Sequence, residues 1–173
     1  KVRKKVGIRV FSGVEIDIQK DGSLDLPKQK LKQLDVVIAA LHTSLDMPEA
    51  EITQRVCHAL ENYPINILGH PTCIKFGERE RININLEKVF AVAKKNNVAM
   101  EINSSSQRMD LSGSLVKAAI DAGCKLVISS DAHGIDTINN SYLGLLCARR
   151  GWAEKKDVLN CWDLKKMEKE LKK

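Results

Sequence analysis

The chain has 173 residues, of which 43% are hydrophobic and 29% charged, so it is long enough for one globular domain and too apolar for an intrinsically disordered protein. Its longest apolar runs, such as Val36 to Leu41, are far too short to cross a bilayer, and we expect no membrane partner. Five of its six net positive charges lie in the first ten residues, so the body is almost neutral and charge alone does not indicate a nucleic-acid-binding surface.

The amino-terminal part of the chain combines a β-branched stretch with turn and helix signals. Within residues 7–18, Val14, Ile16 and Ile18 alternate with Glu15 and Asp17, which places both carboxylates on one face of a strand. The elements predicted here are this strand, a turn at Asp21-Gly22, a short helix over 27–34 and a buried strand over 35–41 that runs directly into His42.

The same alternation continues to the carboxyl terminus. Capping residues and glycine mark the ends of the predicted helices, and short apolar strands separate them. In order, we predict a helix from an N-cap at Thr53 through Glu61, a strand over 65–68, a helix from an N-cap at Asn85 to Asn97, a strand over 98–102, a helix opened by Ser112 or Ser114 and ended by Gly123, a strand over 126–129, and a helical stretch from about Ile138 with Asp163 capping the last helix.

Strands separated by helices predict βαβ units and a mainly parallel sheet, either open or closed into a barrel. Such folds carry their chemistry at the carboxyl ends of the strands. The polar residues at the predicted strand ends form a series: Glu15, His42, His70, Glu101 with Asn103, and Asp131 with His133.

Imidazole and carboxylate ligands that meet at one end of a sheet suit zinc, manganese or iron, and ions of this kind activate water for hydrolysis. The sequence has no GxSxG elbow, P-loop or GxGxxG after a strand, which argues against a serine hydrolase, an NTPase and a dinucleotide enzyme. Its five cysteines include no C-x-x-C pair, so we expect structural thiols in a reducing cytoplasm: Cys57, Cys73, Cys124, Cys147 and Cys161.

An ordered set of motifs resembles the polymerase and histidinol phosphatase (PHP) domain. These motifs are GVEIDI at 13–18, DGSLD at 21–25, LGHPT at 68–72, MEIN at 100–103, RMDL at 108–111 and SDAH at 130–133. The closing segment, ARRGWAEK at 148–155 followed by DVLN at 157–160, resembles the carboxyl terminus of bacterial and archaeal family X DNA polymerases. The resemblance covers nearly the whole chain.

The resemblance implies a distorted β/α barrel, TIM-like and seven-stranded in the family, that holds up to three metal ions, manganese or zinc. It implies a metal-dependent phosphoesterase that acts as a 3′-5′ exonuclease in DNA repair. Carried over by position, Glu15 bridges two metals, His42 and His70 complete one metal site, Asp131 binds the first metal and His133 a third. Asn103 and Arg108 would bind substrate near the mouth, and no catalytic group is assigned beyond the metal ligands.

The chain departs from the family pattern at its start. The family's H-x-H strand and further upstream histidines are absent, so we expect residues 1–173 to form a single PHP-type domain that lacks this segment, an incomplete barrel with two open edges and fewer bound metals. We favour a fragment of a longer protein over a chain that covers the opening by self-association or with a partner. Cys73-Ile74 also replace the Gly-Arg pair that usually follows His-Pro-Thr in the family.

Three functions remain open at this point. The first is the phosphoesterase module of a family X DNA polymerase, with DNA 3′ ends as substrate and a polymerase domain in the same full-length chain. The second is a small-molecule phosphatase of the histidinol-phosphate type, and the third is a non-catalytic structural remnant.

Several polar residues have a structural alternative. For Asp17, a position on the solvent-exposed face of a strand is as good an explanation as a functional role. For Glu101 and Asn103, capping the sheet or bonding a loop is an equally weighted structural alternative. We expect Arg149 and Arg150 to lie on a solvated face rather than in a DNA groove. We expect Trp152 and Trp162 to pack against the protein rather than to stack on bases.

Overall fold

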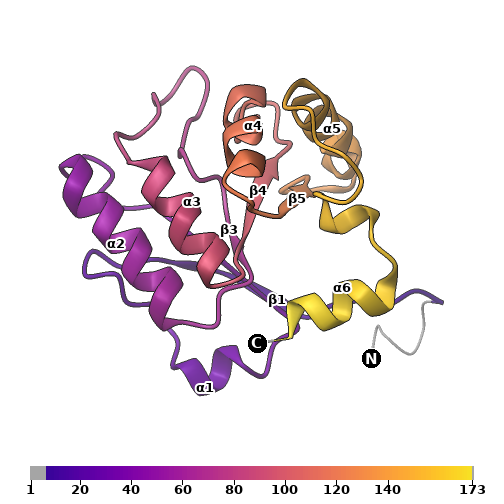
Figure 1. Cartoon of the computed structure of the whole chain (residues 1–173), viewed down its shortest axis with the longest axis horizontal. Helices are drawn as coiled ribbons and strands as arrows, with labels where there is room; N and C mark the ends of the chain where they lie inside the picture. The colour runs from indigo at the N-terminus through magenta and orange to yellow at the C-terminus, as the bar shows by residue number, and fades with distance from the viewer. Residues whose placement is uncertain (1–6, 173) are drawn as a thin grey trace.

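Five parallel strands form one open sheet at the centre of the protein (Figure 1). The computed structural model describes residues 7–172, and the four basic residues among positions 1–5 lie outside this range. The strands pair in chain order: β1 (Gly13–Asp17), β2 (Val36–Ala40), β3 (Ile67–Leu68), β4 (Ala99–Asn103) and β5 (Leu126–Ser129). The structure therefore confirms the α/β class and the parallel sheet, and the described strands do not close into a barrel, as expected of an incomplete one.

The helices follow the predicted alternation. They are α1 (Lys28–Leu31), α2 (Glu49–Asn62), α3 (Leu86–Lys95), α4 (Gly113–Asp121), α5 (Ser141–Arg150) and α6 (Leu164–Leu171), with 3₁₀ turns at Ile135–Asn140 and Leu159–Cys161. Two predicted N-caps are confirmed, since the Asn85 side chain accepts the Lys88 amide and the Asp163 side chain accepts the Lys166 amide. The predicted final helical stretch is interrupted after Arg150, where α5 ends with Gly151 as its C-cap.

Helix α2 begins at Glu49, before the predicted N-cap at Thr53, so that prediction was wrong. Pro48 precedes the first turn with a φ of −54°, close to the helical value, and Glu49 and Glu51 place negative charge at the amino end. Thr53 lies inside the helix, buried, and its hydroxyl accepts the Asn85 amide at 3.0 Å. Its polar atom binds a distant segment rather than its own helix, which a local pattern does not indicate.

The two faces of the sheet differ in what covers them. Helices α2 to α5 pack against one another in chain order along one face, where they enclose the main core with strand residues such as Ile16, Ala39 and Met100 (Figure 1). The opposite face carries a small apolar cluster of Ile67, Ala99, Val127 and Leu159. Glu15 pairs in register with Ile38, and Glu101 with Val127, so both carboxylates lie on this second face.

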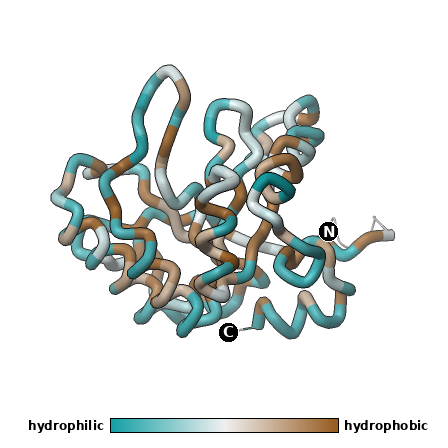
Figure 2. The backbone as a smooth tube through the Cα atoms, turned by 45° about the horizontal axis from the view of Figure 1, so that its top comes forward, coloured by the Kyte–Doolittle hydropathy of each residue, from teal (hydrophilic) through white to brown (hydrophobic). Residues whose placement is uncertain are grey.

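Helix α6 crosses the amino ends of the strands. Asn66 Nδ2, just before β3, donates to the Leu171 carbonyl at 2.6 Å, and Arg9 Nε, before β1, lies 2.8 Å from Glu168 Oε1. Most of α6 is hydrophilic (Figure 2), and no helix among residues 7–172 is long and apolar enough to cross a membrane. The opposite, carboxyl ends of the strands are left for the polar residues of the predicted site.

The outer edge of β5 is covered, contrary to the expectation of two open edges. Asn160 behaves as a backbone unit, since its Oδ1 accepts the Ile128 amide at 2.8 Å and its Nδ2 donates to the Ile128 carbonyl at 3.0 Å. The Leu126 amide donates to the Asp157 carbonyl at 2.8 Å. At the other end of the described sheet, β1 pairs with β2 alone.

The close approach of α5 to the sheet gives a stability prediction. A Cβ on Gly144 would overlap Ser104 Oγ and lie 2.8 Å from Ile128 Cγ2. We expect Gly144→Ala to lower the free energy of unfolding by about 1–3 kcal/mol in urea titrations. Helix propensity alone would raise it by about 1 kcal/mol, so the sign of the change tests the packing. The control is Leu145→Ala, at an exposed neighbouring position, which should change stability by less than about 0.5 kcal/mol.

Candidate metal centre

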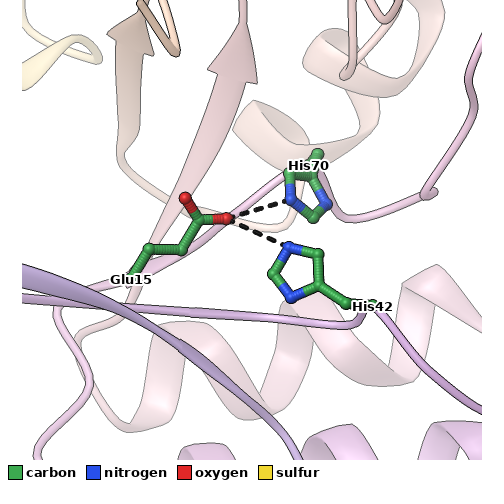
Figure 3. A group of neighbouring side chains, drawn as sticks. All are labelled: Glu15, His42 and His70. Carbon is green, nitrogen blue, oxygen red and sulfur yellow. Dashed lines mark hydrogen bonds and ion pairs between the residues drawn. The ribbon is translucent and has the colours of Figure 1, made fainter. Parts of the chain in front are cut away.

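Three predicted ligands meet at the carboxyl end of the sheet (Figure 3). Glu15 lies in β1, His42 two residues after β2 and His70 two residues after β3. Glu15 Oε1 is 3.3 Å from His42 Nε2 and 3.2 Å from His70 Nε2, and the two rings make an edge contact. One ligand atom from each residue lies within 4.8 Å of the other two. Because the carboxyl ends of neighbouring parallel strands lie at the same end of the sheet, residues far apart in sequence come together here.

The charges of the cluster are coupled. Hydrogen bonds from His42 and His70 hold the pKa of the Glu15 carboxyl well below its usual value. The same carboxylate raises the pKa of His42. His70 is almost completely buried, whereas Glu15 and His42 are partly exposed. The cluster therefore holds an ionised carboxylate that solvent can reach.

Asp17 orients the turn that carries His42. Its Oδ1 accepts the His42 amide at 3.0 Å, and its Oδ2 accepts the Thr43 hydroxyl at 3.2 Å. Asp17 Oδ1 also lies 3.7 Å from His42 Nδ1. Of the two interpretations left open for Asp17, a solvent-facing side chain and a functional one, the geometry favours a role in holding His42.

Buried carboxylates hold the turn that carries His70. Glu101 Oε2 accepts the His70 amide at 2.6 Å, and Asp110 Oδ2 accepts the Thr72 amide at 2.8 Å. The His70 backbone has a φ of 27°, in the left-handed region that a non-glycine residue occupies at a cost. These two bonds fix the backbone on both sides of Pro71 and stabilise that conformation.

The surroundings of the two carboxylates oppose their charge. Burial raises the pKa of Glu101, although hydrogen bonds from Ser129 and the His70 amide act against it. Burial raises the pKa of Asp110 to about 6. Asp110 Oδ1, Thr72 Oγ1 and His70 Nδ1 are buried without a hydrogen-bond partner among the described protein atoms.

The other predicted site residues form a second group. Asp131 Oδ2 accepts Asn103 Nδ2 at 3.1 Å and lies 3.9 Å from Arg108 Nε. The same Asn103 amide lies 3.3 Å from Glu101 Oε2, which links this group to the His70 turn. His133 is 87% exposed, and its Nδ1 is 3.8 Å from Asp131 Oδ1. Within the described residues, the cluster with metal-ligand spacing contains neither Asp131 nor His133.

The substrate-binding predictions have different geometry. Asn103 is buried, its Nδ2 is engaged by two carboxylates and its Oδ1 accepts the Ser105 amide at 3.0 Å. Arg108 is 14% exposed and its Nη1 lies 3.4 Å from the Ile74 carbonyl. Both roles stay predictions, and in this structure Asn103 holds the two carboxylates in place.

Asp110 and Arg55 contribute to the site without having been among the predicted site residues. Asp110 belongs to the RMDL motif, so the motif itself was the available signal. Arg55 lies on the apolar face of α2, between Ile52 and Val56, where a charged side chain is unusual. That break in the helical pattern was visible in the sequence.

The donor set fits a divalent transition metal. Two imidazole nitrogens and one carboxylate oxygen are ligands that zinc, manganese and iron accept, and three protein ligands leave coordination positions for water or substrate. Metal ions of this class compete with protons for both histidines, so binding weakens at low pH.

Known proteins are similar in sequence to this chain. The chain is 39% identical over 164 residues to the DNA polymerase/3'-5' exonuclease PolX of Bacillus subtilis (strain 168), which covers 95% of this chain and 29% of that protein. It is 36% identical over 137 residues to a protein of Thermoanaerobacter sp. (strain X514) named a probable phosphatase, covering 73% of this chain and 54% of that protein. A Clostridium novyi (strain NT) protein, also named a probable phosphatase, is 33% identical over 147 residues, or 80% of this chain and 58% of that protein.

The chain thus spans 29% to 58% of the length of these relatives. No protein-family model matches the chain.

The ion pair between Glu15 and His42 predicts that the free energy of unfolding of the metal-free chain depends on pH. A carboxyl with a lowered pKa stabilises the fold above its unfolded pKa of about 4.3, and this contribution is lost as the pH falls through the folded value. A histidine with a raised pKa stabilises it below about 6.5, and this contribution is lost as the pH rises through the folded value.

We therefore expect Glu15→Gln to destabilise the chelator-treated protein most near pH 5.5, roughly midway between those two values, and much less near pH 9. Urea unfolding at both pH values measures the difference. Glu61→Gln, at an exposed position of α2, is the control and should show no such dependence. An equal loss for Glu15→Gln at both pH values would contradict the assigned pair.

Proposed function

Because the chain belongs to the PHP family, we propose that its site hydrolyses phosphate esters with the help of divalent metal ions. One observation carries the proposal: Glu15 Oε1 and the Nε2 atoms of His42 and His70 converge on one accessible point at the carboxyl ends of adjacent strands. A manganese or zinc ion held there supplies Lewis acidity toward a phosphoryl oxygen and lowers the pKa of water.

The side chains around this point have separate proposed roles. The Arg108 guanidinium lies beside Asp131 in the second group, and it can pair with a phosphate oxygen once Asp131 has another cationic partner. Glu101 and Asp110 keep the His70 turn in place and Asp17 keeps the His42 turn in place. Asp131 and His133 remain the proposed ligands of further metal ions, of which we expect fewer here than the three of a complete site.

The finer proposal is hydrolysis at DNA 3′ ends, as in a 3′-5′ exonuclease that prepares ends for repair. It is supported by identity to PolX along 95% of this chain. The alternative of a small-molecule phosphatase is favoured by the relatives named probable phosphatases, which align with 73% and 80% of this chain. A non-catalytic remnant is the third alternative, and the assembled cluster of three ligands argues against it.

The proposal extends to the rest of the protein. The match covers 29% of the Bacillus PolX protein, so we propose that residues 1–173 form a single PHP-type domain next to a polymerase domain in a cytoplasmic full-length chain. Self-association through the uncovered side of the sheet is the alternative arrangement.

Removal of the Glu15 or the His70 side chain should strongly reduce the phosphoesterase activity. We expect Mn²⁺-stimulated release of nucleotides from single-stranded DNA by the full-length protein, and a fall of more than about 100-fold in Glu15→Ala and His70→Ala, since even indirect support of a ligand is worth about 10–100-fold. His58→Ala is the control, because His58 is exposed in the middle of α2. Unchanged activity in both ligand variants would contradict the assignment.

The substrate class is tested with the same variants. A 3′-recessed DNA duplex and histidinol phosphate are compared side by side, and preference for the small ester would replace the exonuclease proposal with the phosphatase alternative. The 173-residue chain alone should show weak turnover, because the first metal site keeps only Glu15 and Asp131 of its expected ligands.

Metal binding by the 173-residue chain is a separate prediction. We expect Zn²⁺ or Mn²⁺ to raise the unfolding free energy by about 2.7 kcal/mol at a free concentration of about 100 times the dissociation constant. The increase should be absent in His70→Ala and present in His58→Ala. Stabilisation that is equal in both variants would place the bound metal elsewhere.

A further inference from the structure

Arg55 is a buried arginine in helix α2. It is 2% exposed and shares the inward face of the helix with Ile52 and Val56, which are fully buried. A cation taken out of water is costly unless its N–H groups are all satisfied. Its position therefore calls for a specific set of acceptors.

The oxygen acceptors of Arg55 are backbone carbonyls of two separate segments, and Met47 Sδ lies 3.6 Å from Nη1. Its Nε donates to Gln19 O at 2.8 Å and to Ile18 O at 3.1 Å, and Nη2 also donates to Ile18 O. On the other side, Nη1 donates to Thr43 O at 3.0 Å and to Ser44 O at 3.1 Å. One guanidinium thus joins the turn after β1 to the turn after β2.

Both segments lead directly to the metal cluster. Ile18 and Gln19 follow the strand that carries Glu15, and Thr43 and Ser44 follow His42. The first turn also approaches α2 closely: a Cβ on Gly22, whose φ is +84°, would lie 2.9 Å from the Arg55 carbonyl oxygen. The first turn therefore packs closely against the helix backbone, and the Arg55 side chain bonds both turns.

The type of side chain matters at this position. An apolar residue could fill the same space but would leave four carbonyl oxygens without these donors. Lysine offers a point charge on a flexible stem, whereas the planar fork of arginine presents five N–H groups in fixed directions. The fork of Arg55 bonds both segments at once.

We propose that Arg55 is a positioning residue for the metal cluster, which sets the place of the His42 turn relative to β1 and so the separation of Glu15 Oε1 and His42 Nε2. This inference rests on the proposed function, because it assigns Arg55 a role in the same site. Asp17 makes the second connection between these segments through the His42 amide, and His70 is held independently by Glu101.

The test compares Arg55→Lys and Arg55→Met with Val56→Ala, which removes core packing from the neighbouring position of the same helix. The first measurement is amide hydrogen exchange in the metal-free 173-residue chain. We expect exchange at the His42 amide to be at least about tenfold faster in Arg55→Lys than in Val56→Ala, because local opening of the turn precedes global unfolding. The His70 amide should exchange alike in the two variants.

The second measurement is Zn²⁺ affinity by titration calorimetry. We expect a loss of about 10–100-fold in Arg55→Lys, a larger loss in Arg55→Met and wild-type affinity in Val56→Ala. Arg55→Lys alone decides the question if Arg55→Met does not fold.

Two results would overturn the inference. The first is exchange at His42 that matches Val56→Ala, and the second is faster exchange with unchanged Zn²⁺ affinity, which would make Arg55 a stabilising residue only. Failure of the proposed metal centre would give a different result, because wild type and Glu15→Gln would then bind Zn²⁺ equally. Hydrogen exchange at the His42 amide would still decide whether Arg55 holds the turn.

Discussion

The contact of one carboxylate oxygen, Glu15 Oε1, with two imidazole nitrogens is the interaction on which the rest of the site depends. The three residues are far apart in sequence, and they meet because β1, β2 and β3 run parallel and end at one edge. This contact pairs a carboxylate of lowered pKa with a histidine of raised pKa. The three side chains are thus held together by hydrogen bonds and opposite charge, and a bound divalent ion would replace these interactions.

The cluster is supported mainly through the backbone. Asp17 holds the amide of His42, Glu101 holds the amide of His70, and Asp110 holds the amide of Thr72. Arg55 complements these acceptors by donating to carbonyls of the turns after β1 and β2. Charged side chains bonded to backbone groups fix the turns without bonding to the three ligand atoms, which contact only one another within the cluster.

Local patterns predicted the elements well because their signals are local. The strand over 126–129 and the caps at Asn85 and Asp163 depend on hydrophobic period and on a side chain that bonds its own helix. Thr53 failed as a cap because its hydroxyl binds Asn85, and the covered edge of β5 depends on the side chain of Asn160. The predicted ligands came from strand ends, but the grouping of Asp131 with Asn103 and Arg108, apart from Glu15, depends on side-chain geometry that no sequence spacing determines.

The Asn160 side-chain amide makes the two edges of the described sheet different. It covers the edge of β5 by imitating a peptide group, whereas β1 pairs with β2 alone, so a further strand can be added to the described sheet beside β1. Glu15 lies in that edge strand. A segment that extends the sheet beside β1 would therefore lie next to the metal ligands, and the polar residues at its end would join the site rather than a remote surface.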